Sequence, residues 1–195
     1  MGIRLRWVVF LLLLLPGARA SWSFDRELLL PDTRTLASLW VGENLPAGTR
    51  ILSDHEADAP RIAMSRDFAL HLYELMKASG HPRRRYYQLM ASGHPGGGYE
   101  VYQVHRAAAE LLSGPWHAQW SAAGRPVMDV REGLDVARKA GVEVVILTSF
   151  GLARNESEPY VLQTRSQGRL LSEFRPETGK IRGPHIEIYR VGSER

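Results

Sequence analysis

The sequence predicts an α/β protein with a small open, mostly parallel sheet flanked by helices, preceded by a hydrophobic N-terminal signal or truncated transmembrane segment. Helical and strand patterns alternate along the chain, which is typical of helices packed on a sheet. The nearly continuous apolar run at 142–148 indicates a strand buried on both faces, as in a parallel sheet. The chain has 195 residues, 44% hydrophobic and 24% charged, which suits one globular domain with an appendage.

The N-terminal segment has the organisation of an export signal. Two arginines precede an apolar run at 7–15, Pro16 and Gly17 interrupt it, and Ala18 and Ala20 give the small-x-small end of a cleavage site. A helix needs about 20 apolar residues to span the core of a bilayer, and this run supplies less than half of them. The segment therefore fits a signal peptide better than a complete membrane anchor.

Two interpretations of this segment remain open. Residues 1–20 are either a signal peptide, with the mature chain starting at Ser21, or the remnant of a last transmembrane helix. A buried core element is disfavoured, because five consecutive leucines at the terminus have no evident packing partner. Both interpretations make residues 21–195 an extracytoplasmic α/β domain, in the periplasm or at the cell surface, that is membrane-attached or secreted.

Helices and strands alternate in the first half of the domain. Asp32 can cap a helix, and the Pro and Gly residues at 46–48 separate that helix from a strand. Gly80 and Gly93 can end two further helices, and each is followed closely by a proline that cannot continue the helix. We therefore expect helices at 33–44, 68–77 and 83–91, with strands at 50–54 and 99–104.

The second half of the domain begins with a long loop at 113–126. Asp129 and Glu132 have the spacing of a capping box, which predicts a helix from there to Ala140 with Gly141 at its C-terminal cap. Three further elements are expected, namely a buried central strand at 142–148, a helix at 158–170 and an alternating edge strand at 185–191. This order of elements predicts a two-layer or three-layer α/β sandwich.

A polar cluster follows the first predicted strand. It consists of Asp54, His55, Glu56 and Asp58, and ligand sites of open α/β sheets lie beyond the carboxyl ends of their strands. Carboxylates and an imidazole there could bind a divalent cation or transfer protons, but a solvated polar loop is the favoured interpretation. No second set of residues has metal-ligand spacing, so we assign neither a metal nor a cofactor.

The basic residues are almost all arginine. The formal net charge is +4, and lysine supplies only Lys77, Lys139 and Lys180 of the 25 basic residues. This composition fits either an anionic partner or a genome that favours arginine codons. The one dense cluster, Arg83, Arg84 and Arg85, is too short for a nucleic-acid stripe and is a candidate contact for anions such as lipid headgroups.

Several enzyme classes are disfavoured by the motifs. The absence of cysteine excludes disulfides, thiolate metal sites and a cysteine nucleophile. Ser149 lacks the first glycine of a nucleophile elbow, and the glycines at 96–98 lack the lysine and helix of a nucleotide loop. Trp116 and Trp120 are four residues apart and fit either the core or a patch that faces a partner.

Segments spread along the chain carry a family resemblance. They are 31–37, 40–52, 85–87, 98–102, 140–149, 173–176 and 183–191. In order and spacing they resemble the soluble C-terminal domain of the GT-C membrane glycosyltransferases, the protein-mannosyltransferase-like and aminoarabinose-transferase-like enzymes that use polyprenyl-phosphate sugars. The similarity covers most of the chain from about Phe24 onward.

The resemblance implies an accessory domain that is not catalytic by itself. The catalytic carboxylate of that family lies in an early extracytoplasmic loop among many membrane helices, so no catalytic residue is carried over. The implied roles are acceptor recognition, stabilisation of the membrane part of a glycosyltransferase, or docking of a partner, with the chain standing alone or truncated. The residues leave open an independent secreted or periplasmic binding protein, or a small hydrolase that uses the Asp54–Asp58 cluster.

Overall fold

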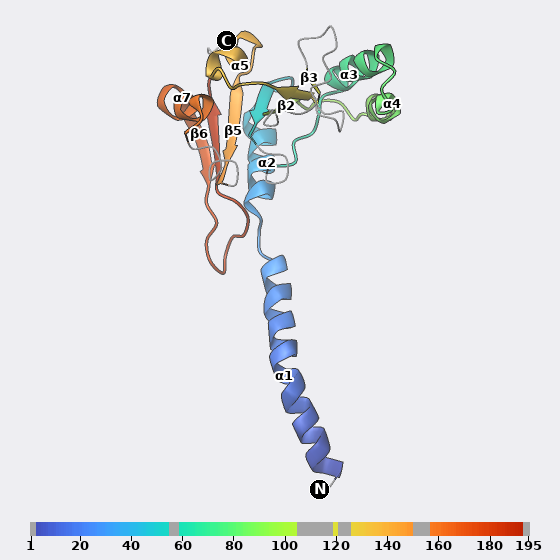
Figure 1. Cartoon of the computed structure of the whole chain (residues 1–195), viewed down its shortest axis with the longest axis vertical. Helices are drawn as coiled ribbons and strands as arrows, with labels where there is room; N and C mark the ends of the chain where they lie inside the picture. The colour runs from blue at the N-terminus through green and yellow to red at the C-terminus, as the bar shows by residue number, and fades with distance from the viewer. Residues whose placement is uncertain (1–2, 55–58, 105–118, 121–125, 150–156, 193–195) are drawn as a thin grey trace.

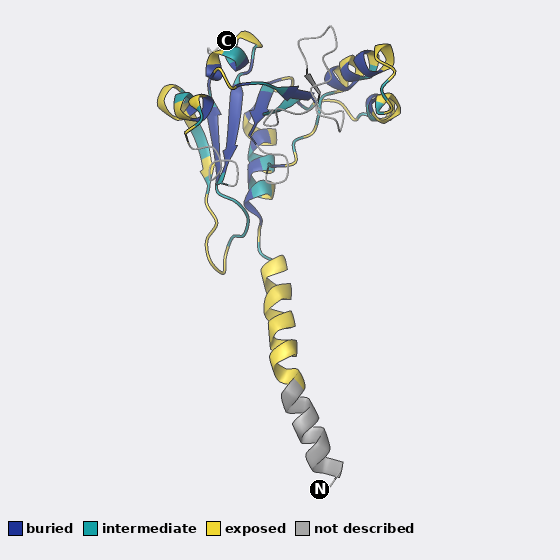
Figure 2. Cartoon of the chain, in the orientation of Figure 1, coloured by how far each residue is buried: buried dark blue, intermediate teal, exposed yellow. Residues whose placement is uncertain are grey.

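A long N-terminal helix leads away from the folded domain. The computed structural model describes residues 3–54, 59–104, 119–120, 126–149 and 157–192, with side chains from Leu14 onward and without those of Gln119 and Trp120. Helix α1 (Ile3–Leu28) is 26 residues long and projects from one end of the domain (Figure 1). From Leu14 onward it is exposed along its whole length (Figure 2), so it makes no part of the core.

The domain combines helices and strands, as the sequence predicts. The helices after α1 are α2 (Thr33–Asn44), α3 (Arg66–Ala78), α4 (Arg84–Ser92), α5 (Leu134–Lys139) and α7 (Pro159–Gln167). The strands are β1 (Arg50–Ser53), β2 (Glu100–Val104), β3 (Gln119–Trp120), β4 (Pro126–Met128), β5 (Val144–Thr148), β6 (Arg169–Phe174) and β7 (Ile186–Arg190).

The described strands form one open sheet in the order β3-β4-β2-β1-β5-β7-β6. The four strands β4, β2, β1 and β5 run parallel to one another. Strand β3 is added antiparallel at one edge, and β7 and β6 are added antiparallel at the other. The predicted open α/β sheet is therefore confirmed, with a parallel centre and antiparallel margins.

The sheet lies between two helical layers. Successive residues of a strand point to opposite faces, so Val144 and Ile146 pack toward α2, whereas Val145 and Leu147 pack toward α5 and α7. All five residues of β5 are buried. The prediction of a buried central strand is confirmed, and the three-layer form of the sandwich is the one observed.

Helices α3 and α4 form a separate hairpin with its own small core. Phe68, Leu72 and Met76 of α3 pack on Tyr87 of α4, and Tyr102 of β2 joins this cluster to the sheet. The Phe68 and Tyr102 rings are 5.1 Å apart between centroids. Figure 1 shows that the hairpin lies at the end of the domain remote from α1. The hairpin is thus fixed to the sheet but has an outer surface of its own.

Two predictions about the C-terminal part were wrong. The segment at 185–191 is an interior strand, because β6 pairs with its outer side through a register that extends to Phe174. The sequence prediction extended a helix to Leu170 and so missed β6, whereas α7 ends at Gln167 and Gly168 follows it as the C-cap. The pairing with β6 covers the outer edge of β7, which accounts for the burial of β7.

The predicted capping box at Asp129 and Glu132 was also wrong. Helix α5 begins only at Leu134, after Gly133, and Asp129 instead accepts a hydrogen bond from the backbone amide of Arg131 at 3.1 Å. The first amide of α5 donates to the side-chain oxygen of Gln163 on α7 at 2.6 Å. A partner from another helix therefore replaces the local cap that the spacing predicted.

Candidate functional site

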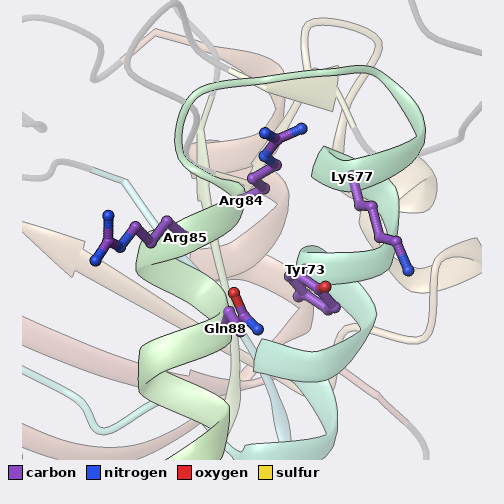
Figure 3. A pocket seen from close by; sticks show the side chains of 5 residues that line it. All are labelled: Tyr73, Lys77, Arg84, Arg85 and Gln88. Atoms are coloured by element: carbon purple, nitrogen blue, oxygen red, sulfur yellow. The ribbon is translucent and has the colours of Figure 1, made fainter.

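A basic pocket lies between α3 and α4. It has a volume of about 330 Å³, near the lower end of the usual range of small-molecule sites. Figure 3 shows Tyr73 and Gln88 lying between the two helices, whereas Arg85 and Lys77 point outward on opposite sides. The residues that line it are Tyr73 and Lys77 from α3, and Arg84, Arg85 and Gln88 from α4.

The positive charge of this pocket is only partly balanced. Lys77 lies 3.7 Å from Glu74, and its ammonium group is 5.6 Å from the centroid of the Tyr73 ring. The side chains of Arg84 and Arg85 are exposed, and neither pairs with an acidic group in the part of the chain that the structure describes. Two unbalanced guanidinium groups beside a pocket favour an anionic ligand, since guanidinium binds phosphate and carboxylate through paired hydrogen bonds.

The remaining arginine of the predicted cluster, Arg83, has a different position. Arg83 does not line the pocket, and its guanidinium carbon lies 5.7 Å from the centroid of the Tyr86 ring. Tyr86 in turn meets Tyr87 edge-on, with 5.2 Å between ring centroids. Burial raises the pKa of Tyr87 to about 12, so this tyrosine stays neutral and serves as core. The structure thus places Arg84 and Arg85 at the pocket and Arg83 on an aromatic pair.

The acidic candidate Asp54 is part of the interior. Its side chain is only 1% exposed, and one carboxylate oxygen accepts a hydrogen bond from the backbone amide of Thr148 at 2.8 Å. This bond connects the end of β1 with the end of β5. His55, Glu56 and Asp58 lie outside the described residues. In this arrangement Asp54 joins the ends of two strands.

A second polar cluster lies where β6 and β7 pair. Glu173, His185 and Glu187 each offer a ligand atom, and these atoms lie within 4.8 Å of one another. The Nε2 atom of His185 is 2.7 Å from Glu173 and 3.8 Å from Glu187. The three groups could therefore hold a cation as far as distance is concerned.

Arginines already occupy both carboxylates of this cluster. Arg165 donates two hydrogen bonds to Glu187, each 3.1 Å long, and Arg175 donates to Glu173 at 2.8 Å. The hydrogen bond from Arg175 is the main reason that the pKa of Glu173 lies below its usual value. A metal ion would have to displace these arginines, so the cluster fits an ion-pair network better than a metal centre.

Other sequence candidates have structural roles or fall outside the structure. The Ser149 hydroxyl accepts a hydrogen bond from the backbone amide of His185 at 3.1 Å, so it connects the ends of β5 and β7. Trp116 and the side chain of Trp120 lie outside what the structure describes.

Sequence reasoning missed most of the pocket. It identified Arg84 and Arg85 from their density but not Tyr73, Lys77 or Gln88. Tyr73 and Lys77 are four residues apart on one predicted helix, which places them on the same face. That spacing was the available signal, but it could not show which helix would lie opposite.

Comparison of the chain with protein-family models, curated proteins and solved structures finds no match. Within the described part of the chain, no helix combines the length and apolar character needed to cross a membrane.

Proposed function

We propose that this chain is a non-catalytic extracytoplasmic domain of a lipid-linked-sugar-dependent membrane glycosyltransferase, acting alone or as part of a longer protein. In this proposal α1 attaches the domain to the membrane and the α3–α4 pocket binds an anionic group. The glycosyltransferase assignment rests on the sequence resemblance.

The exposed apolar surface of α1 is the observation that carries the proposal. Trp22 is 69% exposed and Phe24 is 60% exposed, and Leu14, Leu15 and Leu28 are also exposed on the same helix. A soluble domain rarely presents so many large apolar side chains in one segment unless a membrane or another protein covers them. Tryptophan is also favoured where apolar and polar phases of a membrane meet.

The position of Asp54 supports an accessory role. A general acid or base must reach the substrate within hydrogen-bond distance, whereas Asp54 is buried and accepts a hydrogen bond from a backbone amide. We therefore do not assign catalysis to Asp54. The alternative function, a small hydrolase, depends on Asp58, His55 and Glu56. The activity experiment below tests it through the Asp58→Asn variant.

Membrane attachment is tested first, by flotation of the full chain with lipid vesicles. Wild type is expected to float with the vesicles, whereas a variant with Trp22→Ser, Phe24→Ser and Leu28→Ser should remain in the soluble fraction. Leu70→Ser serves as the control, because Leu70 is an exposed leucine on α3 that lies outside α1. Equal flotation of the triple variant and wild type would remove the membrane role of α1.

Glycosyl transfer is tested next, in cells that naturally make this chain. Without the chain, we expect less consumption of polyprenyl-phosphate sugar by isolated membranes. Both the wild-type chain and Asp58→Asn should restore consumption, because the domain does not perform the chemistry. Turnover by the purified chain alone, lost in Asp58→Asn while the circular dichroism stays unchanged, would overturn the non-catalytic proposal.

A further inference from the structure

We propose that the α3–α4 pocket binds the phosphate group of a small phosphomonoester in the aqueous phase. This inference names the ligand class of the anion site in the proposed function and rests on that proposal only for its biological context. The chemistry itself follows from the pocket. Its elements are a concave surface, a positive charge that no described acidic group fully balances, and the polar side chains of Tyr73 and Gln88.

The charge of the pocket matches a dianion. Glu74 partly balances Lys77 at 3.7 Å, so Arg84 and Arg85 contribute the charge that remains. A phosphomonoester carries about −1.5 to −2 near neutral pH and offers three acceptor oxygens. A carboxylate would balance only half of this charge. A phosphomonoester therefore suits the two guanidinium groups better than a simple carboxylate does.

The size and floor of the pocket favour a small polar ligand. A volume of about 330 Å³ holds a phosphate and a group of modest size, not an extended polymer. Gln88 can both donate and accept hydrogen bonds, and Tyr73 offers a ring face and a hydroxyl. Figure 3 shows these two side chains between the helices, where the non-phosphate part of a ligand would lie.

The position of the pocket favours a soluble ligand over the headgroups of the membrane that α1 would contact. Figure 1 shows α3 and α4 at the end of the domain remote from α1. A membrane around the far end of α1 would lie beyond the opposite end of the domain. In this orientation α3 and α4 lie away from the membrane surface.

The arginines must rearrange to bind one phosphate together. Figure 3 shows the Arg84 and Arg85 guanidinium groups pointing in different directions. Both side chains are exposed, so they are free to turn, but their ordering lowers the affinity. We therefore expect weak and rapidly reversible binding that improves when a ligand also contacts Gln88 or Tyr73.

The test uses the full chain and inorganic phosphate, with amide chemical shifts followed by NMR at constant ionic strength. Saturable shifts are expected at α3 and α4. Arg84→Gln combined with Arg85→Gln should weaken binding about tenfold or more, since each loses a charge-assisted contact. Arg61→Gln is the matched control, because Arg61 is exposed and does not line the pocket. Absence of saturable shifts in the wild-type chain, or equal binding by the double arginine variant, would overturn the proposal.

A second arm separates the two sources of phosphate. The Trp22→Ser, Phe24→Ser and Leu28→Ser variant removes the apolar contact of α1, and it is mixed with vesicles of phosphatidylcholine with or without phosphatidic acid. We expect it to bind inorganic phosphate and to stay off both vesicles. Flotation with phosphatidic acid vesicles that requires Arg84 and Arg85, without binding of inorganic phosphate, would replace the soluble ligand with a lipid headgroup. Neither result depends on the flotation of the wild-type chain, so membrane attachment and phosphate binding can fail separately.

Discussion

Glu173 and Glu187 lie directly opposite one another in the antiparallel pair of β6 and β7. Two carboxylates in this relationship repel each other and destabilise a strand pair. The structure offsets the repulsion with cations on both sides, since Arg165 pairs with Glu187 and Arg175 pairs with Glu173. His185 lies between the two carboxylates, 2.7 Å from Glu173. The attachment of β6 to the sheet therefore depends chiefly on the cation beside Glu187, the more buried of the two carboxylates.

Removal of Arg165 should weaken this margin of the sheet. Arg165→Met keeps much of the aliphatic side chain but leaves Glu187, which is 7% exposed, without its bidentate partner. We expect a loss of about 1–3 kcal/mol, because a carboxylate in the interior loses its ion pair while some solvent still reaches the arginine site. The free energy of unfolding from urea titration measures this loss.

A second variant separates charge from packing at this position. Adding Glu187→Gln to Arg165→Met removes the carboxylate charge that has lost its arginine, so part of the lost stability should return. Arg175→Met is the matched control, and it should leave the urea midpoint nearly unchanged because that pair is open to solvent. A double variant no more stable than Arg165→Met alone would contradict the charge-balance explanation.

Local patterns predicted the centre of the fold but not its margins. The apolar run that forms β5 and the cap at Asp32 depend on neighbouring residues, and both were found from sequence. The Asp32 side chain accepts a hydrogen bond from the Arg34 amide at 2.9 Å, as its position predicted. Strand β6 was missed because its exposed and half-buried residues give no clear alternation.

Long-range pairing also explains what was missed in the sites. The cluster of Glu173, His185 and Glu187 exists only because the register of β6 and β7 places these residues together. In the same way, the pocket needs α3 to pack beside α4, which the Tyr73–Lys77 spacing cannot show. Arg84 and Arg85 were identified because a run of like charge is visible in the sequence without any tertiary contact.

The buried strand β5 should not tolerate a charge. Val145 is 0% exposed and pairs in register with Leu52 on one side and Tyr189 on the other. Val145→Asp places an unpaired carboxylate there, which costs several kcal/mol and approaches the whole stability of a domain. We expect loss of the cooperative melt followed by circular dichroism. Val145→Ala should still fold, with a loss of about 2–3 kcal/mol from the smaller side chain. Equal melting of Val145→Asp and wild type would refute the assignment of β5 to the interior.

The turn before β2 contains two glycines that should respond differently to alanine. Gly97 and Gly98 both have positive φ, 69° and 89°. A Cβ at Gly97 meets nothing within 4 Å, whereas a Cβ at Gly98 would lie 2.6 Å from the backbone oxygen of Met64. Met64 is bridged to Tyr99, so the backbone there cannot easily move.

We therefore expect Gly97→Ala to cost about 1–2 kcal/mol, the usual penalty of a left-handed backbone. Gly98→Ala should cost more, about 3 kcal/mol or above, because a steric clash with backbone is added. Paired urea titrations of the two variants measure the difference. Similar losses in both would show that the segment around Met64 yields to the added methyl group.

Alkaline pH should destabilise the core of the α3–α4 hairpin through Tyr87. Burial raises the pKa of this phenol to about 12, whereas tyrosine in an unfolded chain ionises near 10. Between these two pH values the folded state keeps a proton that the unfolded state releases. Its stabilising contribution is therefore complete below about pH 10 and is lost as the pH rises toward 12. The loss is on the order of 2 kcal/mol, from a pKa difference of about two units.

Tyr87→Phe isolates this contribution, because phenylalanine keeps the ring in the cluster with Leu72 and Met76 but cannot ionise. The decline of the unfolding free energy between pH 10 and 12 should be shallower in Tyr87→Phe than in wild type. Tyr86→Phe is the matched control, since its neighbouring ring is 53% exposed, and it should decline as wild type does. The other buried tyrosines are common to all three proteins, so the difference reports Tyr87 alone. Parallel pH profiles for Tyr87→Phe and wild type would mean that solvent reaches the Tyr87 hydroxyl in the folded hairpin.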